Sequence, residues 1–569
     1  MPPRPKAIHA VVYFAASMLL VACFAAAQQT HPSHYDVLIQ NGTIFDGKGG
    51  VGYQADLAIQ GDRIAAIGKL SGADAKRTID ASGLIVAPGF IDMLGQSEWS
   101  LLVDSRALSK LSQGITTEIT GEGGSIAPQN QRTLDPLKPM LDQYHLKVDW
   151  TSLDGYFRRL EHDGTPINLG TYVGAAQVRE AVLGDDNRDP TPAEMQEMQE
   201  LVAQAMKDGA LGVSTALIYP PGHYAKTEEL IELTKVASRY GGIYATHMRS
   251  EGRSELEALD EAIRIGVEAH LPVEIFHLKV SGKSRWGSMP RVVAKIQAAR
   301  NAGLDIAADI YPYVAGGTAL ASSLPPWVAD GGMDKLLERL GDPAIRSRIR
   351  KELATDHPDW ENLYLDCGGA PGVMISSVTD PKLKAYTGKT LAQVAAEQKK
   401  DPIDALFDFV LADRGQTGAL YFMASEQDNE YAWRQTWTSV GLDAPETPLD
   451  GPLYEPHTHP RTWGSMPRVL GPFVRDKHLT TLEEAIRKIT SLPAQRERLT
   501  DRGLLRPGFY ADITVFNAAA IQDEATFREP AKVSKGVEWV FVNGELAYEK
   551  GKLTGARPGR ALRGPGWRP

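Results

Sequence analysis

The sequence has few cysteines, no excess of basic residues and no internal repeat. Cys23 and Cys367 are the only two cysteines among 569 residues, so no framework of disulfide bonds supports the fold. Asp and Glu outnumber Lys and Arg by 71 to 61, and we find no clustered basic face typical of a nucleic-acid-binding protein. With 43% hydrophobic residues, a chain of this length can bury the core of a large catalytic domain with appended domains.

Residues 1–29 have the pattern of an export signal. Arg4 and Lys6 form a basic start, and residues 10–21 form an apolar run that is too short to cross a bilayer. Two processing signals compete after this run: Ala25–Ala27 resembles a cleavage site, and the Leu-Val-Ala-Cys that ends at Cys23 resembles a bacterial lipobox. The sequence therefore predicts export to the bacterial periplasm, with a lipid on Cys23 as the alternative to simple cleavage. A buried N-terminal helix is disfavoured by the basic flank.

Both ends of the remaining chain show the pattern of short β-strands separated by turns. Near the start, residues 55–59 form a strand-like run that ends in a Gly-Asp turn signal. Near the end, residues 537–542 form a similar run, followed by an Asn-Gly turn. Because isolated strand edges need partners, we predict that residues 35–87 and 495–560 pack together as one β-sandwich domain.

Strand-like runs alternate with helical patterns through the middle of the chain. The runs are residues 90–94, 115–120, 167–174, 211–217, 243–248, 273–280, 304–311 and 438–443. One helical pattern begins at Thr191, a typical N-cap with Glu194 three residues later. Eight alternations predict an α/β fold, a (β/α)8 TIM barrel, over residues 88–494. An open doubly wound sheet is the alternative, but no glycine-rich phosphate-binding turn follows an early strand.

Residues 316–416 lie between the last two predicted strands and are too many for a loop. Helical patterns within them, such as residues 335–340 and 391–398, predict an inserted small domain. Active sites of such barrels lie at the carboxyl ends of the strands. The insertion is therefore expected to cover the catalytic face as a lid.

Three candidate metal ligands follow predicted barrel strands. His247 and His277 end the fifth and sixth strands, and Glu122 ends the second strand between glycines that permit close approach. Two neutral imidazoles and a carboxylate suit a zinc ion. A lone histidine is more often a core or surface residue, but two at adjacent strand ends favour a metal site. His457 and His459 also have ligand-like spacing, although no predicted strand places them at the barrel mouth.

Charged and phenolic side chains cluster at the same predicted strand ends. Asp443 ends the eighth strand, where a carboxylate can take a proton from water and pass it to a leaving amine. Lys279 and Arg249 lie two residues beyond the histidines and share their face by strand alternation. Tyr311 ends the seventh strand, and Arg461 lies in a turn-rich stretch. Together these groups suit an anionic substrate, with surface salt bridges as the alternative role of each.

The order and spacing of these motifs resemble the D-aminoacylase (N-acyl-D-amino-acid deacylase) family of the amidohydrolase superfamily. The resemblance runs from about residue 35 to 555 and rests on Val86–Asp92, Gly209–Ser214, Tyr219–Gly222, Thr246–Arg249, His277–Lys279, Tyr311–Tyr313, His459–Arg461, Gly464–Arg468, Arg502–Gly503 and Gly508–Ile513. It implies a zinc-dependent barrel that hydrolyses the amide of N-acyl-D-amino acids. It also implies that His247 and His277 bind the tightly held metal and that Asp443 is catalytic. By the same resemblance, Lys279, Tyr311 and Arg461 hold the carboxylate and carbonyl of the substrate.

The chain departs from the family pattern at the first barrel strand. Leu94 and Gln96 stand where the family has its His-x-His pair, and Glu122 stands in place of a bridging cysteine. Leucine cannot bind zinc and an amide is a poor ligand, whereas a carboxylate can still bind zinc or bridge two ions, although it is harder and less strongly donating than thiolate. These losses fall mainly on the weaker second metal site, so we predict one Zn²⁺ per chain. Glu98 has the strand parity to restore part of the lost site.

The sequence thus predicts an exported zinc hydrolase that cleaves an amide next to a free carboxylate. The expected partner is a small N-acyl amino acid or peptide-like molecule, with no nucleic acid and with membrane contact only through a lipid on Cys23. A dipeptidase or an amidase of other specificity is one alternative on the same scaffold. A non-catalytic periplasmic binding barrel is a second alternative, which the full set of candidate catalytic residues disfavours.

Overall fold

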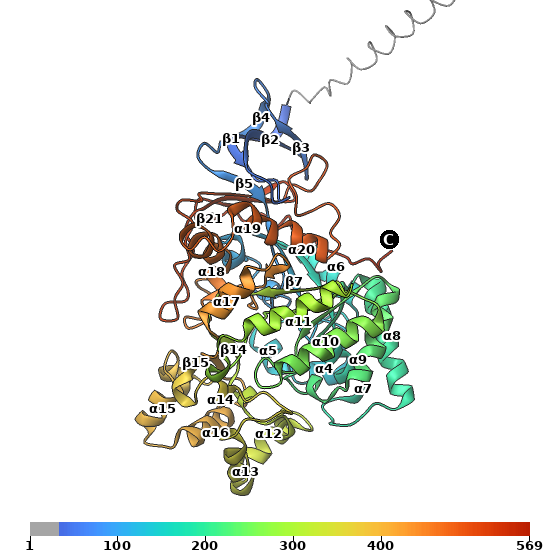
Figure 1. Cartoon of the computed structure of the whole chain (residues 1–569), viewed down its shortest axis with the longest axis vertical. Coiled ribbons are helices and arrows are strands. Elements are labelled where there is room, and N and C mark those ends of the chain that lie inside the picture. The colour runs from blue at the N-terminus through green and yellow to red at the C-terminus, as the bar shows by residue number, and fades with distance from the viewer. Residues whose placement is uncertain (1–33, 569) are drawn as a thin grey trace, which may run out of the picture.

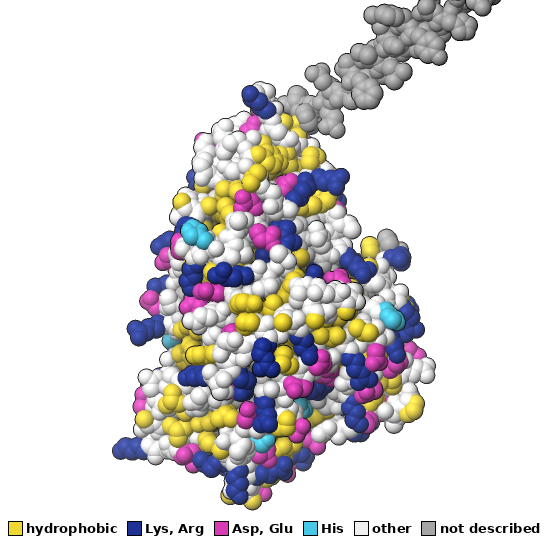
Figure 2. Space-filling model, viewed as in Figure 1, with side chains coloured by type: hydrophobic (Ala, Val, Ile, Leu, Met, Phe, Trp, Pro, Cys, Tyr) yellow, Lys and Arg dark blue, Asp and Glu magenta, His cyan; other side chains and the backbone are white. Residues whose placement is uncertain are grey.

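The molecule consists of a β domain, a barrel ringed by helices and an inserted domain, arranged along its long axis (Figure 1). The computed structural model describes residues 34–568, so the predicted export signal and Cys23 lie outside the described residues. No helix within residues 34–568 is both long enough and apolar enough to cross a membrane. The face drawn in Figure 2 carries basic and acidic side chains interspersed with apolar ones, in keeping with the modest net charge of −10.

The two ends of the described chain join in one continuous sheet of nine strands. In spatial order these are β21 (Lys552–Leu553), β20 (Glu545–Glu549), β19 (Val537–Val542), β18 (Ile513–Phe516), β5 (Ile85–Pro88), β1 (His34–Ile44), β2 (Tyr53–Gln60) and β3 (Arg63–Gly68), with β4 (Asp74–Asp80) paired to β1. The junction is the antiparallel pair of β18 and β5, where Val515 lies opposite Val86. Apolar side chains from both ends, such as Ile59 and Phe541, share one core. The folded sheet therefore fixes both chain ends against the barrel.

Parallel strands close into a barrel within the described residues. The strands are β6 (Phe90–Asp92), β7 (Ile115–Thr120), β8 (Asn168–Thr171), β9 (Val173–Gly174), β10 (Gly212–Ala216), β11 (Ile243–His247), β12 (Val273–Ile275), β13 (Ile306–Ile310) and β17 (Thr438–Val440). Only Tyr172 separates β8 from β9, which together act as the third barrel strand. The barrel closes where the Met93 N–H donates to the Val440 carbonyl at 3.0 Å and Gly95 pairs with Ala444. The predicted α/β class with a (β/α)8 barrel is confirmed, and the strands fall within the predicted runs.

Amphipathic helices surround the barrel. They are α2 (Ser100–Val103), α3 (Leu108–Leu111), α4 (Gln131–Leu134), α5 (Lys138–Gln143), α6 (Leu153–Asp163), α7 (Ala175–Leu183), α8 (Pro192–Asp208), α9 (Thr227–Arg239), α10 (Glu255–Ala269), α11 (Met289–Asn301), α17 (Glu426–Trp433), α18 (Arg461–Arg468), α19 (Leu482–Lys488) and α20 (Ser491–Arg496). α8 begins at the predicted capping box of Thr191 and Glu194. Its apolar face, with Met198, Val202 and Met206, is buried in the main core. This burial packs the helix against β9 and the neighbouring helices α7 and α9.

The chain between β13 and β17 forms a domain with its own core. β14 (Gly316–Ala319), β16 (Gly418–Tyr421) and β15 (Val373–Ser377) form an antiparallel sheet with β16 in the middle. The accompanying helices are α12 (Met333–Leu340), α13 (Pro343–Leu353), α14 (Leu363–Asp366), α15 (Leu391–Gln398) and α16 (Pro402–Ala412). Leu340, Phe407 and Tyr421 belong to this core. Because β16 is the central strand, the inserted domain extends to Tyr421, beyond the residue 416 expected from the sequence.

A buried charge cluster lies at the closure of the barrel. Lys110 donates to Asp92 and to the Ala444 carbonyl, both at 2.8 Å, and its Nζ lies 3.2 Å from Glu118 Oε1. The side chains of Lys110, Asp92 and Glu118 are all 0% exposed. A buried carboxylate without a cation is costly, so the single charge of Lys110 stabilises the two acids and offsets part of the repulsion between them. The cluster thereby fixes the loop that carries Asp443 against β6.

We predict that Lys110→Met lowers the free energy of unfolding by about 3–5 kcal/mol, because it leaves the carboxylates of Asp92 and Glu118 buried without their cation. Chemical denaturation followed by circular dichroism measures the change. Lys138→Met is the matched control, since Lys138 forms an exposed pair with Asp142 at 3.0 Å and such pairs contribute about 0–1 kcal/mol. Equal denaturation midpoints for the two variants would contradict the structural role of the cluster.

Candidate metal centre

The carboxyl ends of three barrel strands bring Glu122, His247 and His277 together. Their ligand atoms lie within 4.8 Å of one another, and no other such group of ligands occurs in the described part of the chain. Glu122 Oε1 lies 3.0 Å from His247 Nδ1 and 2.9 Å from His277 Nε2. Two imidazole nitrogens and a carboxylate oxygen that converge on one point match the donor set of a zinc site. The three candidate ligands predicted from the sequence therefore meet.

Unusual backbone conformations place these side chains. Glu122 precedes Gly123, whose φ of 71° lies in the left-handed region, and a Cβ there would lie 2.5 Å from the backbone nitrogen of Ala216. Glycine is thus required beside Glu122 so that the loop can approach β10. His277 and Asp443 themselves have φ values of 35° and 51°. Left-handed residues other than glycine carry strain, which is found more often at functional sites than elsewhere.

Glu251 lies buried behind the two histidines, a role that the sequence analysis missed. Its Oε1 lies 3.0 Å from His277 Nδ1 and 2.7 Å from Lys279 Nζ, and its Oε2 lies 3.7 Å from His247 Nε2. Burial favours a raised pKa for Glu251, but Lys279 and the two histidines hold that pKa well below its ordinary value. A carboxylate behind a metal-binding histidine fixes the tautomer and orientation of the ring. Its position four residues after His247 was the available signal.

Lys279 is a buried cation at the edge of the centre. Its Nζ donates to both oxygens of Glu251 at 2.7 Å and lies 5.3 Å from the centroid of the Tyr311 ring. Burial alone would lower the pKa of Lys279, but the Glu251 carboxylate raises it above its ordinary value. Lys279 therefore remains charged beside Tyr311. Its Nζ donates hydrogen bonds to Glu251 and not to Tyr311.

Asp443 lies between Arg461 and Gln96. Arg461 Nη1 is 2.7 Å from Asp443 Oδ2, whereas Gln96 Nε2 donates to Asp443 Oδ1 at 3.3 Å and to Glu122 Oε2 at 2.7 Å. Burial raises the pKa of Asp443 above its ordinary value, and the Arg461 guanidinium opposes this effect. The guanidinium also lies 4.6 Å from the Tyr311 ring centroid. Gln96 thus connects the candidate base to the candidate metal ligand.

The structure does not bring Arg249 to this centre. Its guanidinium donates to Glu261 at 2.9 Å and to the backbone carbonyls of His223 and Ala225 at 2.9 and 2.8 Å. These contacts occupy its donors, so the predicted substrate contact of Arg249 has no support in the structure. The prediction extended strand alternation past β11, which ends at His247.

The remaining candidates also lie outside the centre. His459 donates from Nε2 to a backbone carbonyl at 2.8 Å and accepts from the Arg461 N–H through Nδ1 at 3.0 Å. Burial lowers the pKa of His459 well below its ordinary value, so the neutral ring positions Arg461. His457 lies against Gly388 of the inserted domain. Glu98, whose pKa burial raises to about 7, contacts the end of β7 and does not restore a metal site.

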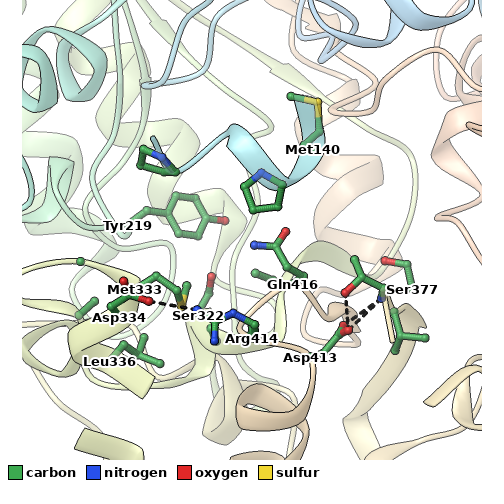
Figure 3. A pocket seen from close by; sticks show the side chains of 18 of the residues that line it. Met140, Tyr219, Ser322, Met333, Asp334, Leu336, Ser377, Asp413, Arg414 and Gln416 are labelled. Carbon is green, nitrogen blue, oxygen red and sulfur yellow. Dashed lines mark hydrogen bonds and ion pairs between the residues drawn. The ribbon is translucent and has the colours of Figure 1, made fainter. Parts of the chain in front are cut away.

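A pocket of about 1720 Å³ opens between the barrel loops and the inserted domain (Figure 3). Met140 lies on one side, and Arg414 and Gln416 of the inserted domain lie opposite. Tyr219 projects into the space between them, and its ring meets the His247 ring edge-on with the centroids 5.4 Å apart. The pocket therefore borders the metal centre at Tyr219.

Known proteins match this chain over nearly its whole length. The model of the amidohydrolase family matches residues 77–548. The chain is 36% identical to a D-aminoacylase from Alcaligenes xylosoxydans xylosoxydans over 94% of this chain and 99% of that protein. It is 35% identical to an N-acyl-D-glutamate deacylase from the same organism over 93% of this chain and 96% of that protein.

Solved structures show the same relationship. An N-acyl-D-glutamate deacylase from Bordetella bronchiseptica, complexed with zinc and a phosphonate inhibitor, aligns with a TM-score of 0.78 at 31% identity, covering 93% of this chain and 100% of that chain. A D-aminoacylase structure aligns with a TM-score of 0.76 at 36% identity and the same coverage. The chain belongs to the amidohydrolase family and is a hydrolytic enzyme similar to D-aminoacylases, as the sequence motifs predicted.

We predict that Glu251→Gln weakens metal binding by about 10–100-fold, because the amide no longer orients His277 as a full carboxylate does. Competition with a chromophoric chelator measures the affinity for Zn²⁺. Glu261→Gln serves as the control, since Glu261 pairs with Arg249 away from the ligands. Equal affinities in both variants and the unchanged protein would remove Glu251 from the metal centre.

Proposed function

We propose that this enzyme is a zinc-dependent deacylase that hydrolyses the amide of N-acyl-D-amino acids or of related amides that bear a free carboxylate. The convergence of Glu122, His247 and His277 beside Asp443 carries the proposal. The similar proteins named D-aminoacylase and N-acyl-D-glutamate deacylase support this substrate class. The zinc in the Bordetella bronchiseptica structure supports the choice of metal.

Glu122, His247 and His277 would hold one Zn²⁺ per chain. Three protein ligands with an open fourth position are typical of a catalytic zinc site. When bound, zinc polarises a carbonyl and lowers the pKa of water toward neutrality. A D-aminoacylase structure that is 35% identical to this chain, with a TM-score of 0.76, is described in terms of activation by one metal and attenuation by a second metal. This description supports a one-metal enzyme here.

Asp443 is the proposed general base and acid. It accepts a proton from the attacking water and delivers it to the nitrogen of the leaving amine. Burial raises the pKa of Asp443 above its ordinary value, while the Arg461 guanidinium beside it favours the ionised carboxylate that accepts a proton. Arg461 and Gln96 hold one oxygen each, so the carboxylate is oriented before the substrate arrives.

The substrate carboxylate is proposed to bind Arg461, with Tyr311 and Lys279 beside it. Arg461 Nε has no hydrogen-bond partner among residues 34–568, although the residue is buried. A guanidinium with free donors in a buried position suits bidentate capture of a carboxylate. Tyr311 lies against both cations, and together they would steady the carboxylate or the developing oxyanion.

The size of the pocket favours a second candidate function. Its volume of about 1720 Å³ exceeds the roughly 300–1,000 Å³ typical of small-molecule sites. A dipeptidase or an amidase for a longer peptide-like substrate would use this space beyond Tyr219. A non-catalytic binding barrel is disfavoured, because a binder has no need of Asp443 beside three metal ligands.

We further propose that the enzyme is exported to the periplasm. The basic start and short apolar run of residues 1–29 support this location. Mass spectrometry of the protein purified from cells that process such signals tests it. A chain that starts after Ala27 or at a lipid-bearing Cys23 is the expected result, and an unprocessed chain in the cytoplasm would contradict export.

We predict that Asp443→Asn retains its metal but loses turnover by about 10²–10⁴-fold, because an amide cannot accept the proton from water. Steady-state kinetics and elemental analysis of the same sample measure both quantities. Asp334→Asn is the control, because Asp334 lines the pocket and is highly exposed at the side chain. Full activity of Asp443→Asn would refute its role as the base.

A panel of paired D and L N-acyl amino acids, together with dipeptides, tests the substrate class. The zinc-loaded protein is expected to release amino acid from D substrates at a higher kcat/KM than from their L partners. Preferential cleavage of dipeptides would support the second candidate function. Absence of hydrolysis across the panel would contradict both proposals.

A further inference from the structure

Gln96 lies between two carboxylates that converge at the metal centre. Its Nε2 donates to Glu122 Oε2 at 2.7 Å and to Asp443 Oδ1 at 3.3 Å. A side-chain amide nitrogen carries two hydrogens, so both bonds form at once. Since both partners are acceptors when ionised, the nitrogen and not the carbonyl oxygen must face them. The Gln96 amide nitrogen therefore faces the two carboxylates as a hydrogen-bond donor, and no lone pair of Gln96 points between them to bind a metal ion.

The neighbouring residue Leu94 offers no ligand either. Its side chain is 1% exposed and packs in an apolar cluster with Ile91 and Met93. Its backbone carbonyl accepts from the Asp443 N–H at 2.6 Å. The similar D-aminoacylase is described as having a binuclear metal centre. The end of β6 in this chain has no donor set for a second ion.

Charge balance at Asp443 is achieved without a second cation. Its Oδ2 is 2.7 Å from Arg461 Nη1, and its Oδ1 accepts from Gln96. One oxygen of this buried carboxylate is thus ion-paired with the Arg461 guanidinium, and the other accepts a hydrogen bond from Gln96. Glu122, in turn, has one oxygen on the two histidines and the other on Gln96. The amide acts as a neutral bridge between the two acids.

We propose that Gln96 takes the place of a second metal ion. Its amide positions Asp443 beside Glu122 and keeps a second cation out of the space between the two carboxylates. Gln96 is thus a positioning residue that acts through Asp443. The inference rests on the proposed function of a one-metal hydrolase. It explains why the site would hold a single ion.

Metal stoichiometry tests this proposal without any substrate. The full chain and its Gln96→Glu and Gln96→Met variants are equilibrated with excess Zn²⁺, freed of unbound ion and measured by elemental analysis. We expect one ion per chain in the unchanged protein and in Gln96→Met, which adds no ligand. We expect two in Gln96→Glu, because a third carboxylate would join Glu122 and Asp443. Two ions in the unchanged protein, or no second ion in Gln96→Glu, would overturn the proposal.

Kinetics separate positioning from a merely structural role. With a hydrolysed substrate, Gln96→Met is expected to lower kcat by about 10–100-fold with KM nearly unchanged, because Asp443 is no longer oriented. A second equivalent of Zn²⁺ should change kcat in Gln96→Glu but not in Gln96→Met, because only the glutamate adds a ligand for a second ion. Gln204→Met is the control, since Gln204 donates to Asp208 at 2.7 Å on helix α8, far from the proposed chemistry.

Unchanged kcat in Gln96→Met would overturn the positioning role. If no substrate is hydrolysed by the unchanged protein, the proposed function fails, while the metal counts still decide whether Gln96 excludes a second ion. The two failures are therefore distinguishable.

Discussion

The site depends on one carboxylate, that of Glu122, which is bound from three directions. One oxygen contacts His247 and His277, and the other accepts from Gln96. These residues lie at or just beyond the carboxyl ends of the barrel strands β6, β7, β11 and β12. The four strand ends therefore converge on the Glu122 carboxylate. Because Glu122 has glycine on both sides, its loop can enter the crowded mouth of the barrel. Any change that moves Glu122 disturbs the metal ligands and the positioned base together.

Burial makes the supporting interactions strong. Asp92 accepts from the Leu442 N–H at 2.8 Å, and Lys110 donates to the Ala444 carbonyl, so the chain on both sides of Asp443 is fixed to β6 and its ion cluster. On the opposite side of the centre, Glu251 links His277 to Lys279. Lys110 beside Asp92 and Lys279 beside Glu251 each place a cation next to a buried carboxylate, which lowers the high cost of burying an unpaired ion. The barrel therefore presents a site organised before substrate binds.

Much of the fold could be predicted from the sequence, because the periodicity of hydrophobic residues and the spacing of motifs are local properties of the chain. The eight strand runs and the meeting of Glu122, His247 and His277 required only that carboxyl ends of parallel strands converge. For Glu251 the sequence offered only the four-residue spacing from His247, and for the partner of Arg249 it offered no signal, since both contacts depend on the direction of the chain after β11 ends. The role of Gln96 was also hidden, because it depends on which amide atom faces the two carboxylates. Alternation along the strand predicted Glu98 near the second metal site of the family. In the structure its carboxyl group instead contacts Thr120 at the end of β7.

X-ray absorption at the zinc edge of the purified protein tests the central claim most directly, because it reports the ligands and any metal neighbour together. The account predicts a first shell of nitrogen and oxygen at about 2.0–2.2 Å, with the outer scattering of two imidazole rings. It predicts no zinc–zinc scattering. A metal–metal distance of about 3.5–4 Å would show a binuclear centre and contradict the one-metal site. A zinc shell without imidazole scattering would remove His247 and His277 from the centre.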